Sequence, residues 1–334
     1  MTRPRVGAVI VNYNCGPLAI DAALSVLGDA PDASVVIVDN ASPDGSGDRL
    51  RMIAAGAPHV PAAAPADVRF MALAEIRRQV GPRVAESGIN VIQSPTNGGF
   101  AAGCNLGLKA LPRDRLDLLL LLNPDAVVAA GAIDAFARRL EDPSVGLCGA
   151  SVLAFDAPLR VQALGGARLH PLTLLGENLG GGTRLEEAPP TAEIERRLDY
   201  PLGAAIALRP DYIDRAGFLD ERYFLYYEEA DWAFAGQTFS RVGWARDAVV
   251  HHRYGASSKS ARSEARAPSN RSPLSDYHMA RSRLLFALKW RPALAPALTL
   301  LGAAQAGRRL LRGKAAQARA VALGSLPGAA RAFS

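Results

Sequence analysis

The sequence is poor in cysteine, and beyond Asp276 it contains no acidic residue. The three cysteines, Cys15, Cys104 and Cys148, are far apart and lack the spacing of metal ligands. This excludes a disulfide framework as the basis of the fold, and we expect a reducing, cytoplasmic setting. The start of the chain also lacks the long apolar stretch and cleavage site of a signal peptide, which agrees with that expectation.

The basic charge is concentrated near the end of the sequence. The net charge is +6, and ten Lys and Arg residues fall between Arg281 and Arg331. Without them 28 basic and 32 acidic residues remain, so the body of the chain is slightly acidic. Because there is also no basic stripe with interleaved aromatic residues, the sequence predicts no nucleic-acid partner.

Short apolar runs alternate with helical patterns over the first 140 residues. Four runs are typical of strands buried on both faces of a parallel sheet: 6–11, 35–38, 89–93 and 118–122. The spacing of apolar residues predicts two helices, 18–27 and 133–140. The alternation predicts an α/β fold, a doubly wound sheet with helices on both faces.

Residues 57–88 interrupt this alternation with the Ala/Pro-rich stretch APHVPAAAPAD. We expect an exposed insertion here, either a lid or a variable surface excursion, with a short helix over Val68–Val80. A catalytic domain is expected over residues 1–260 and a basic helical extension over residues 261–334.

Two carboxylates follow buried strands. Asp39 ends one run, where a side chain at the edge of a parallel sheet can accept hydrogen bonds from a ribose or a base. Leu121-Leu-Asn-Pro-Asp125 places Asp125 similarly, and hard cations such as Mg²⁺ or Mn²⁺ prefer carboxylate oxygens. In both places a simple turn is the alternative interpretation.

The glycines of Asn97–Gly107 allow the backbone to approach a ligand closely at the start of a helix. A glycine-rich helix start that binds no ligand is equally open. The spacing differs from that of the dinucleotide-binding fingerprint, so a Rossmann dehydrogenase is not indicated.

Three acidic residues, Glu228, Glu229 and Asp231, are crowded by five aromatic residues within Tyr223–Trp232. An apolar environment raises the proton affinity of an acid, which suits a general base near neutral pH. The first turn of any helix also favours acidic residues, but that does not explain the aromatic crowding. Further on, His252 follows a strand-like run and is a candidate metal ligand.

In this order, the stretches closely resemble family 2 glycosyltransferases, in particular the rhamnosyltransferase-like subgroup of polysaccharide assembly. The similarity covers residues 5–260. The matching segments are Val11–Asn14, Val38–Ser42, Asp44–Ser46, Asn97–Ala101 with Gly103 and Asn105, Leu122–Asp125, Gly217–Glu221, Phe224–Tyr226, Glu228–Asp231 and His252–Ser257. The resemblance implies a GT-A fold, a Rossmann-like and mostly parallel sheet, with a C-terminal helical tail.

The resemblance also implies an activity. An inverting enzyme of this kind moves a sugar, rhamnose in the subgroup, from a nucleotide diphosphate donor to a saccharide or lipid-linked acceptor in cell-envelope or polysaccharide synthesis. A divalent cation, Mg²⁺ or Mn²⁺, is implied at Asp125, with His252 as an additional ligand. Glu229 stands where the family has its catalytic Asp, and Glu228 and Asp231 are alternatives. The implied nucleotide-sugar-binding residues are Asn12, Tyr13, Asn14, Asp39, Asn40, Asn97, Gly98, Gly99, Asn105 and Asn123.

Two other classes of protein remain as alternatives. A sugar nucleotidyltransferase needs Arg and Lys in a glycine-rich loop after the first strand, but residues 12–17 contain neither. A non-catalytic nucleotide-sugar-binding protein has no need of the acidic cluster at 228–231.

The C-terminal tail combines basic residues with apolar stretches. Its stretch Pro292–Ala304 has 13 residues, whereas a helix needs roughly 20 to span a bilayer. Three placements are open: on the inner face of an anionic membrane near a lipid-linked acceptor, on the catalytic body, or against a second copy in a homodimer.

Overall fold

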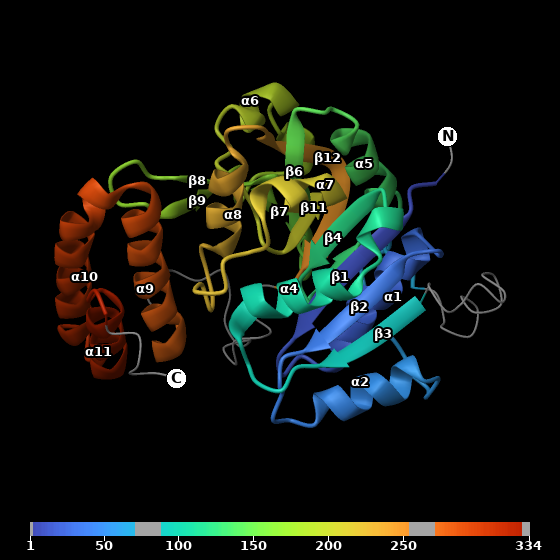
Figure 1. Ribbon diagram of the computed structural model, residues 1–334, viewed down its shortest axis with the longest axis horizontal. Helices are drawn as coiled ribbons and strands as arrows, with labels where there is room; N and C mark the ends of the chain where they lie inside the picture. The colour runs from blue at the N-terminus through green and yellow to red at the C-terminus, as the bar shows by residue number, and fades with distance from the viewer. Residues whose placement is uncertain (1–2, 71–87, 254–270, 329–334) are drawn as a thin grey trace.

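The structure, a computed structural model, describes residues 3–70, 88–253 and 271–328. In these residues a central nine-stranded sheet has the order β3-β2-β1-β4-β11-β6-β12-β5, with β7 beside β6 (Figure 1). Its strands are β1 (Val6–Asn12), β2 (Ser34–Asp39), β3 (Gly88–Gln93), β4 (Leu118–Leu122), β5 (Ala126–Val128), β6 (Val145–Ala154), β7 (Ala157–Leu164), β11 (Ala205–Leu208) and β12 (Arg241–His252). A small sheet joins β10 (Tyr200–Pro201), β8 (Gly166–Leu169) and β9 (Gly176–Asn178).

Helices cover both faces of the central sheet, as the sequence predicts. Within β1, Ala8 and Ile10 face a core formed with α1, α2 and α5, whereas Val9 and Val11 face one formed with α4, α7 and α8. Side chains of a strand point alternately to opposite faces, so a wholly apolar run is required here. The helices of the body are α1 (Pro17–Asp29), α2 (Ser46–Ala54), α4 (Gly99–Ala110), α5 (Ala132–Leu140), α6 (Thr191–Glu195), α7 (Pro210–Ala216) and α8 (Glu228–Gly236).

The strand directions bring several chain segments to one edge of the sheet. Strands β3, β2, β1 and β4 are parallel, and β11 returns antiparallel, so that Ala205 pairs with Leu122. Strand β12 ends beside β5, where His252 pairs with Ala126. The turn at 123–125 therefore lies between the start of β11 and the end of β12.

The described part of the predicted insertion, residues 57–70, is fastened to the body rather than projecting from it. His59 Nε2 lies 2.7 Å from Asp21 Oδ1 on α1, and Asp67 Oδ1 lies 2.9 Å from His251 Nε2 on β12. At Gly28 a Cβ atom would lie 2.1 Å from the carbonyl oxygen of Arg69, so a glycine is needed where the segment crosses α1. Residues 68–70 are not helical, and the rest of the predicted helix lies outside the described residues.

Three helices follow the sheets and lie together on one side of the body (Figure 1). They are α9 (Pro273–Trp290), α10 (Ala295–Leu310) and α11 (Ala315–Gly324). Helix α9 packs on the body through Phe286, which contacts the rings of Tyr227 and Phe234. None of the helices in the described ranges has both the length and the apolar character that crossing a membrane requires.

Candidate active site at the edge of the sheet

Asp39 is the centre of a hydrogen-bond network at the ends of β1 and β2. Asn12 Nδ2 and Ser42 Oγ each donate to its Oδ1 over 2.6 Å, and Gln93 Nε2 donates to its Oδ2 over 2.7 Å. Asn12 pairs with Asp39 across the two parallel strands, so the network is fixed by the strand register. It orders the loops that follow β1 and β2.

Those two loops line an open pocket of about 320 Å³, which reaches the Asp39 network through Ser46, whose hydroxyl accepts a hydrogen bond of 3.0 Å from Asn12 Nδ2. Asn14 lines it with φ near 57°, and its buried Oδ1 has no hydrogen-bond partner among the described residues. Tyr13 precedes it and is exposed. A polar hollow of this size accommodates a nucleoside. Its lining residues are Asn14, Cys15, Gly16, Pro17, Asp44, Gly45, Ser46 and Arg49.

The asparagines of the glycine-rich segment are engaged within the protein. Asn40 Nδ2 donates to Asn97 Oδ1 and to the carbonyl of Gly99, over 3.0 and 2.9 Å. Asn105 Nδ2 donates to the carbonyl of Leu219 over 2.9 Å, and the Leu219 N–H donates to Asn105 Oδ1 over 3.0 Å. The bonds of Asn40 join the loop after β2 to the start of α4, and those of Asn105 join α4 to the loop that precedes α8, residues 217–227.

A glycine is required at position 99 because the start of α4 lies against Phe224 in the loop that precedes α8. Its φ is 87°, and a Cβ atom there would lie 2.2 Å from the carbonyl oxygen of Phe224. That carbonyl instead accepts a hydrogen bond of 2.8 Å from the N–H of Phe100. Gly98 precedes it as the N-cap of α4. The glycines thus allow α4 and the pre-α8 loop to meet.

Asp125 and His252 form a buried pair at the end of β4. Asp125 Oδ1 lies 3.2 Å from His252 Nε2, and Asn123 Nδ2 lies 3.4 Å from the same nitrogen. Within the described ranges Asp125 Oδ1 is buried and accepts no hydrogen bond, which is an unusual state for a carboxylate oxygen.

The pair fits a divalent cation. Two cis ligands, each about 2.1 Å from an octahedral ion, lie about 3.0 Å apart, close to the observed separation. No group of three or more His, Cys, Asp and Glu side chains suitable for a metal occurs in the part of the chain that the structure describes. A hard cation bound by one or two protein ligands takes its remaining ligands from water and substrate phosphates.

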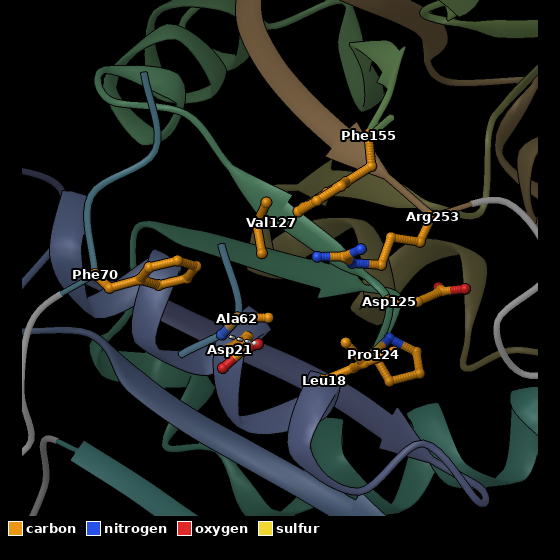
Figure 2. Close-up of a pocket in the computed structure, with 9 residues that line it drawn as sticks. All are labelled: Leu18, Asp21, Ala62, Phe70, Pro124, Asp125, Val127, Phe155 and Arg253. Carbon is orange, nitrogen blue, oxygen red and sulfur yellow. Dashed lines mark hydrogen bonds between the residues drawn. The ribbon is translucent and has the colours of Figure 1, made fainter. Parts of the chain in front are cut away.

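The neighbouring Arg253 is directed away from this pair. Its guanidinium lies 3.3 Å from the centroid of the Phe155 ring and donates to the carbonyl of Ala63 over 3.2 Å. Figure 2 shows it on the side of Val127 and Phe155, whereas the carboxylate of Asp125 points the other way. Arg253 therefore joins β12 to the 57–70 segment behind the site.

Glu228 and Glu229 begin α8 after two residues in the left-handed conformation. Tyr226 and Tyr227 have φ of 69° and 70°, values that bulky residues rarely adopt. Such strain is kept only where the surrounding structure enforces it, and it is common at functional sites. Here it turns two adjacent carboxylates into the protein.

Burial raises the pKa of both carboxyl groups. The pKa of Glu228 is raised well above its usual range, by burial first and by the charge of Glu229 second. Burial raises the pKa of Glu229 to about 7. One buried oxygen of each group, Oε2, has no hydrogen-bond partner among the described residues. Burial thus favours the neutral form of Glu228, whereas a pKa of about 7 leaves Glu229 partly ionised near neutral pH.

Glu229 lies at the same edge as Asp125. A Cβ atom added at Gly203 would be 3.3 Å from Glu229 Oε1, so the carboxyl group contacts the loop before β11. The carbonyl of Ala204 in that loop accepts a hydrogen bond of 3.0 Å from the N–H of Asn123. The structure thus brings the acidic cluster and the Asn-Pro-Asp turn to neighbouring positions.

Asp231 has a different environment from the two glutamates. Its Oδ1 accepts hydrogen bonds from Tyr223 Oη at 3.1 Å and from Trp290 Nε1 at 2.7 Å, and Lys289 Nζ lies 2.7 Å from its Oδ2. Its carboxylate thus joins α8 to α9. The sequence pattern did not reveal Lys289 and Trp290 as partners, because they lie 58 and 59 residues further along the chain.

No model of a protein family matches the sequence, and no curated protein matches it. Solved structures do share its fold. The mannosyltransferase PcManGT from Pyrobaculum calidifontis, in complex with GDP-Man and Mn²⁺, is 14% identical, with a TM-score of 0.51 over 97% of this chain and 86% of that chain. GalNAc-T7 with UDP, GalNAc and Mn²⁺ is 14% identical, with a TM-score of 0.54 over 75% of this chain and 43% of that one.

This likeness confirms the predicted fold. The mostly parallel sheet with helices on both faces is the GT-A fold of these glycosyltransferases, and the C-terminal helices follow it. The chain spans less than half the length of GalNAc-T7.

Proposed function

We propose that the protein is an inverting, metal-dependent glycosyltransferase of family 2, of the rhamnosyltransferase-like kind. The observation that carries this proposal is the convergence of Glu229 with the Asp125–His252 pair at the carboxyl end of β4. Both similar structures contain Mn²⁺ together with a nucleotide or nucleotide sugar, which supports a nucleotide diphosphate sugar as the donor.

We assign the donor to the edge formed by β1, β2 and β4. Its nucleoside enters the pocket lined by the loops after β1 and β2, with Asn14 as a polar contact and the exposed Tyr13 as a stacking surface. Asn40, Asn97 and Asn105 shape the adjoining loop through their internal hydrogen bonds. Asp125 and His252 would hold a divalent cation, Mg²⁺ or Mn²⁺, and such an ion, when bound, would supply positive charge against the leaving nucleotide diphosphate.

Glu229 acts as the general base. Its ionised carboxylate removes the proton of the acceptor hydroxyl, whose oxygen attacks the anomeric carbon as the bond to the diphosphate breaks. Attack from the face opposite the leaving group inverts the anomeric centre, and no covalent intermediate on the protein is needed. Burial raises the pKa of Glu228 well above its usual range and so favours its neutral form, and Asp231 is engaged with α9, so neither suits this role as well.

A screen of nucleotide sugars tests this proposal. We expect one donor to raise the melting temperature in the presence of Mn²⁺ and to release its nucleoside diphosphate, with EDTA abolishing the release. Asp125→Ala should lower the rate of release more than about 100-fold, because it removes the charged metal ligand. Release of pyrophosphate from a nucleoside triphosphate and a sugar phosphate would instead show a nucleotidyltransferase. Stabilisation without turnover would show a binding protein.

We further propose that the turn between α10 and α11 contacts the inner face of the membrane that carries a lipid-linked acceptor. Leu310 and Leu311 are 61% and 91% exposed at this turn. Arg308 and Arg312 flank them and are also exposed. Exposed leucines beside arginines suit the boundary between anionic headgroups and acyl chains.

Sedimentation with vesicles tests the membrane contact. The protein should sediment with phosphatidylglycerol vesicles and not with phosphatidylcholine vesicles, and the double variant Leu310→Asp, Leu311→Asp should stay in the supernatant. Equal sedimentation of the double variant would refute the contact. Loss of a dimer by the same variant in light scattering, without vesicles, would assign the leucines to a homodimer instead.

A further inference from the structure

Gln162 on β7 makes two side-chain contacts with a single residue, His252. Its Nε2 donates to the backbone carbonyl of His252 over 2.9 Å, and its Oε1 lies 2.9 Å from Nδ1 of the imidazole ring. The pairing of β6 with β7 shifts register at this point, since Leu153 pairs with Val161 whereas Val152 pairs with Ala163. Gln162 is thus the extra residue of a β-bulge, a feature that redirects a side chain.

These contacts determine which ring nitrogen carries the proton. A backbone carbonyl only accepts hydrogen bonds, so the amide atom facing it must be the nitrogen, and the amide oxygen must face Nδ1. The oxygen only accepts, so Nδ1 carries the donated proton. A neutral imidazole has a single N–H, which leaves Nε2 with its lone pair.

With its lone pair, Nε2 accepts a long hydrogen bond of 3.4 Å from Asn123 Nδ2 and lies beside the carboxylate of Asp125. It is 3.2 Å from Asp125 Oδ1, yet no hydrogen bond joins these two atoms. Two acceptors at that distance repel each other unless a cation lies between them. In the other tautomer Nε2 would instead donate to the carboxylate, and this hydrogen bond would have to break before a metal could bind.

We propose that Gln162 is a positioning residue that holds His252 with its proton on Nδ1, so that Nε2 and Asp125 together receive the divalent cation. This inference rests on the metal site of the proposed function. It concerns a residue that acts through His252 and that no sequence motif indicated.

The tautomer can be read in the metal-free protein. The chain contains five histidines, so long-range proton–nitrogen NMR spectra can be assigned by mutating each in turn. We expect His252 to carry its proton on Nδ1, and Gln162→Leu to shift it partly to Nε2. A proton on Nε2 in the wild-type protein would overturn the inference whatever the enzyme's activity.

Manganese affinity gives a second measurement, by electron paramagnetic resonance of unbound Mn²⁺. Gln162→Leu should weaken binding about 10- to 100-fold, as loss of a partner behind a metal-bound histidine does. Gln162→Glu should bind at least as tightly as wild type, because its carboxylate still accepts from Nδ1. If the residue only supports the backbone, both variants should weaken binding equally, since neither donates to the His252 carbonyl.

The controls separate this inference from the proposed function. Gln317→Leu on α11, far along the chain from the site, should leave Mn²⁺ affinity unchanged. Wild-type affinity in Gln162→Leu, together with lost binding in Asp125→Ala, would overturn the positioning role and leave the metal site intact. Unchanged binding in Asp125→Ala would overturn both.

Discussion

Glu229→Gln is expected to lower the turnover number for sugar transfer by about 10²- to 10⁴-fold, the usual contribution of a general base. The amide keeps the size of the side chain but cannot accept the proton of the acceptor hydroxyl. Binding of the donor should be nearly unchanged, because the proposed donor site lies around Asp39 and Asp125. Release of nucleoside diphosphate, with calorimetry of donor binding, measures both.

The dependence of kcat/KM on pH in the wild-type enzyme is a second test of Glu229 as the base. Burial raises the pKa of Glu229 to about 7, and the base acts only when ionised. The value of kcat/KM should therefore fall about tenfold per pH unit below 7 and level off above it. The residual rate of Glu229→Gln should lack this acidic limb.

Glu228→Gln is the matched comparison. An amide resembles the protonated acid that burial favours at this position, so the variant should keep most of its activity near neutral pH. If Glu228→Gln abolishes transfer and Glu229→Gln does not, the base is Glu228. Because the two residues are adjacent and both substitutions keep the side-chain size, the comparison of the two variants decides which glutamate is the base.

The fold could be predicted from the sequence because its evidence is local. The apolar runs at 6–11 and 118–122 correspond to β1 and β4. The other two predicted strands and the helices at 18–27 and 133–140 are present within one or two residues at each end, whereas residues 68–70 of the predicted helix 68–80 are not helical. Because the carboxyl ends of parallel strands lie at the same edge of a sheet, Asp39 and Asp125 could be expected at one edge from the sequence.

The functions of the polar residues were harder to predict, because a side chain that binds a ligand and one that fastens a loop look alike in sequence. Asn97 and Asn105 were predicted to bind the nucleotide sugar. In the structure Asn97 accepts a hydrogen bond from Asn40 in the loop after β2, and Asn105 joins α4 to the pre-α8 loop. Their contact with the donor stays a prediction. The bulge at Gln162 depends on strand register, which leaves no local signal.

The aromatic residues that crowd the acidic cluster in sequence belong to the hydrophobic core. Tyr223, Tyr227 and Trp232 are buried in the cores that join α8 to its neighbours. Helix α9 packs against the same segment, through Phe286 on Tyr227 and Phe234 and through Lys289 and Trp290 on Asp231. The C-terminal helices therefore support the first turn of α8, from which the two glutamates come.

Asp231→Leu is expected to lower the free energy of unfolding by about 3 kcal/mol or more. The carboxylate is buried and accepts from three donors. Removing one partner of a buried ion pair costs about 3–5 kcal/mol. We expect the lower end of this range because the side chain of Lys289 is 33% exposed. Urea unfolding measures the loss. Asp48→Ala removes a highly exposed ion-pair partner of Arg51 and should cause no measurable change.

The same variant separates a structural from a catalytic role for Asp231. Asp231 lies in the first turn of α8, two residues after Glu229, and it binds the helix that packs over that turn. Loosening α9 should admit water to the glutamates and lower the pH at which kcat/KM declines, since burial is what raises the pKa of Glu229. Transfer abolished at unchanged stability would instead make Asp231 the base, and Glu229 would lose that assignment.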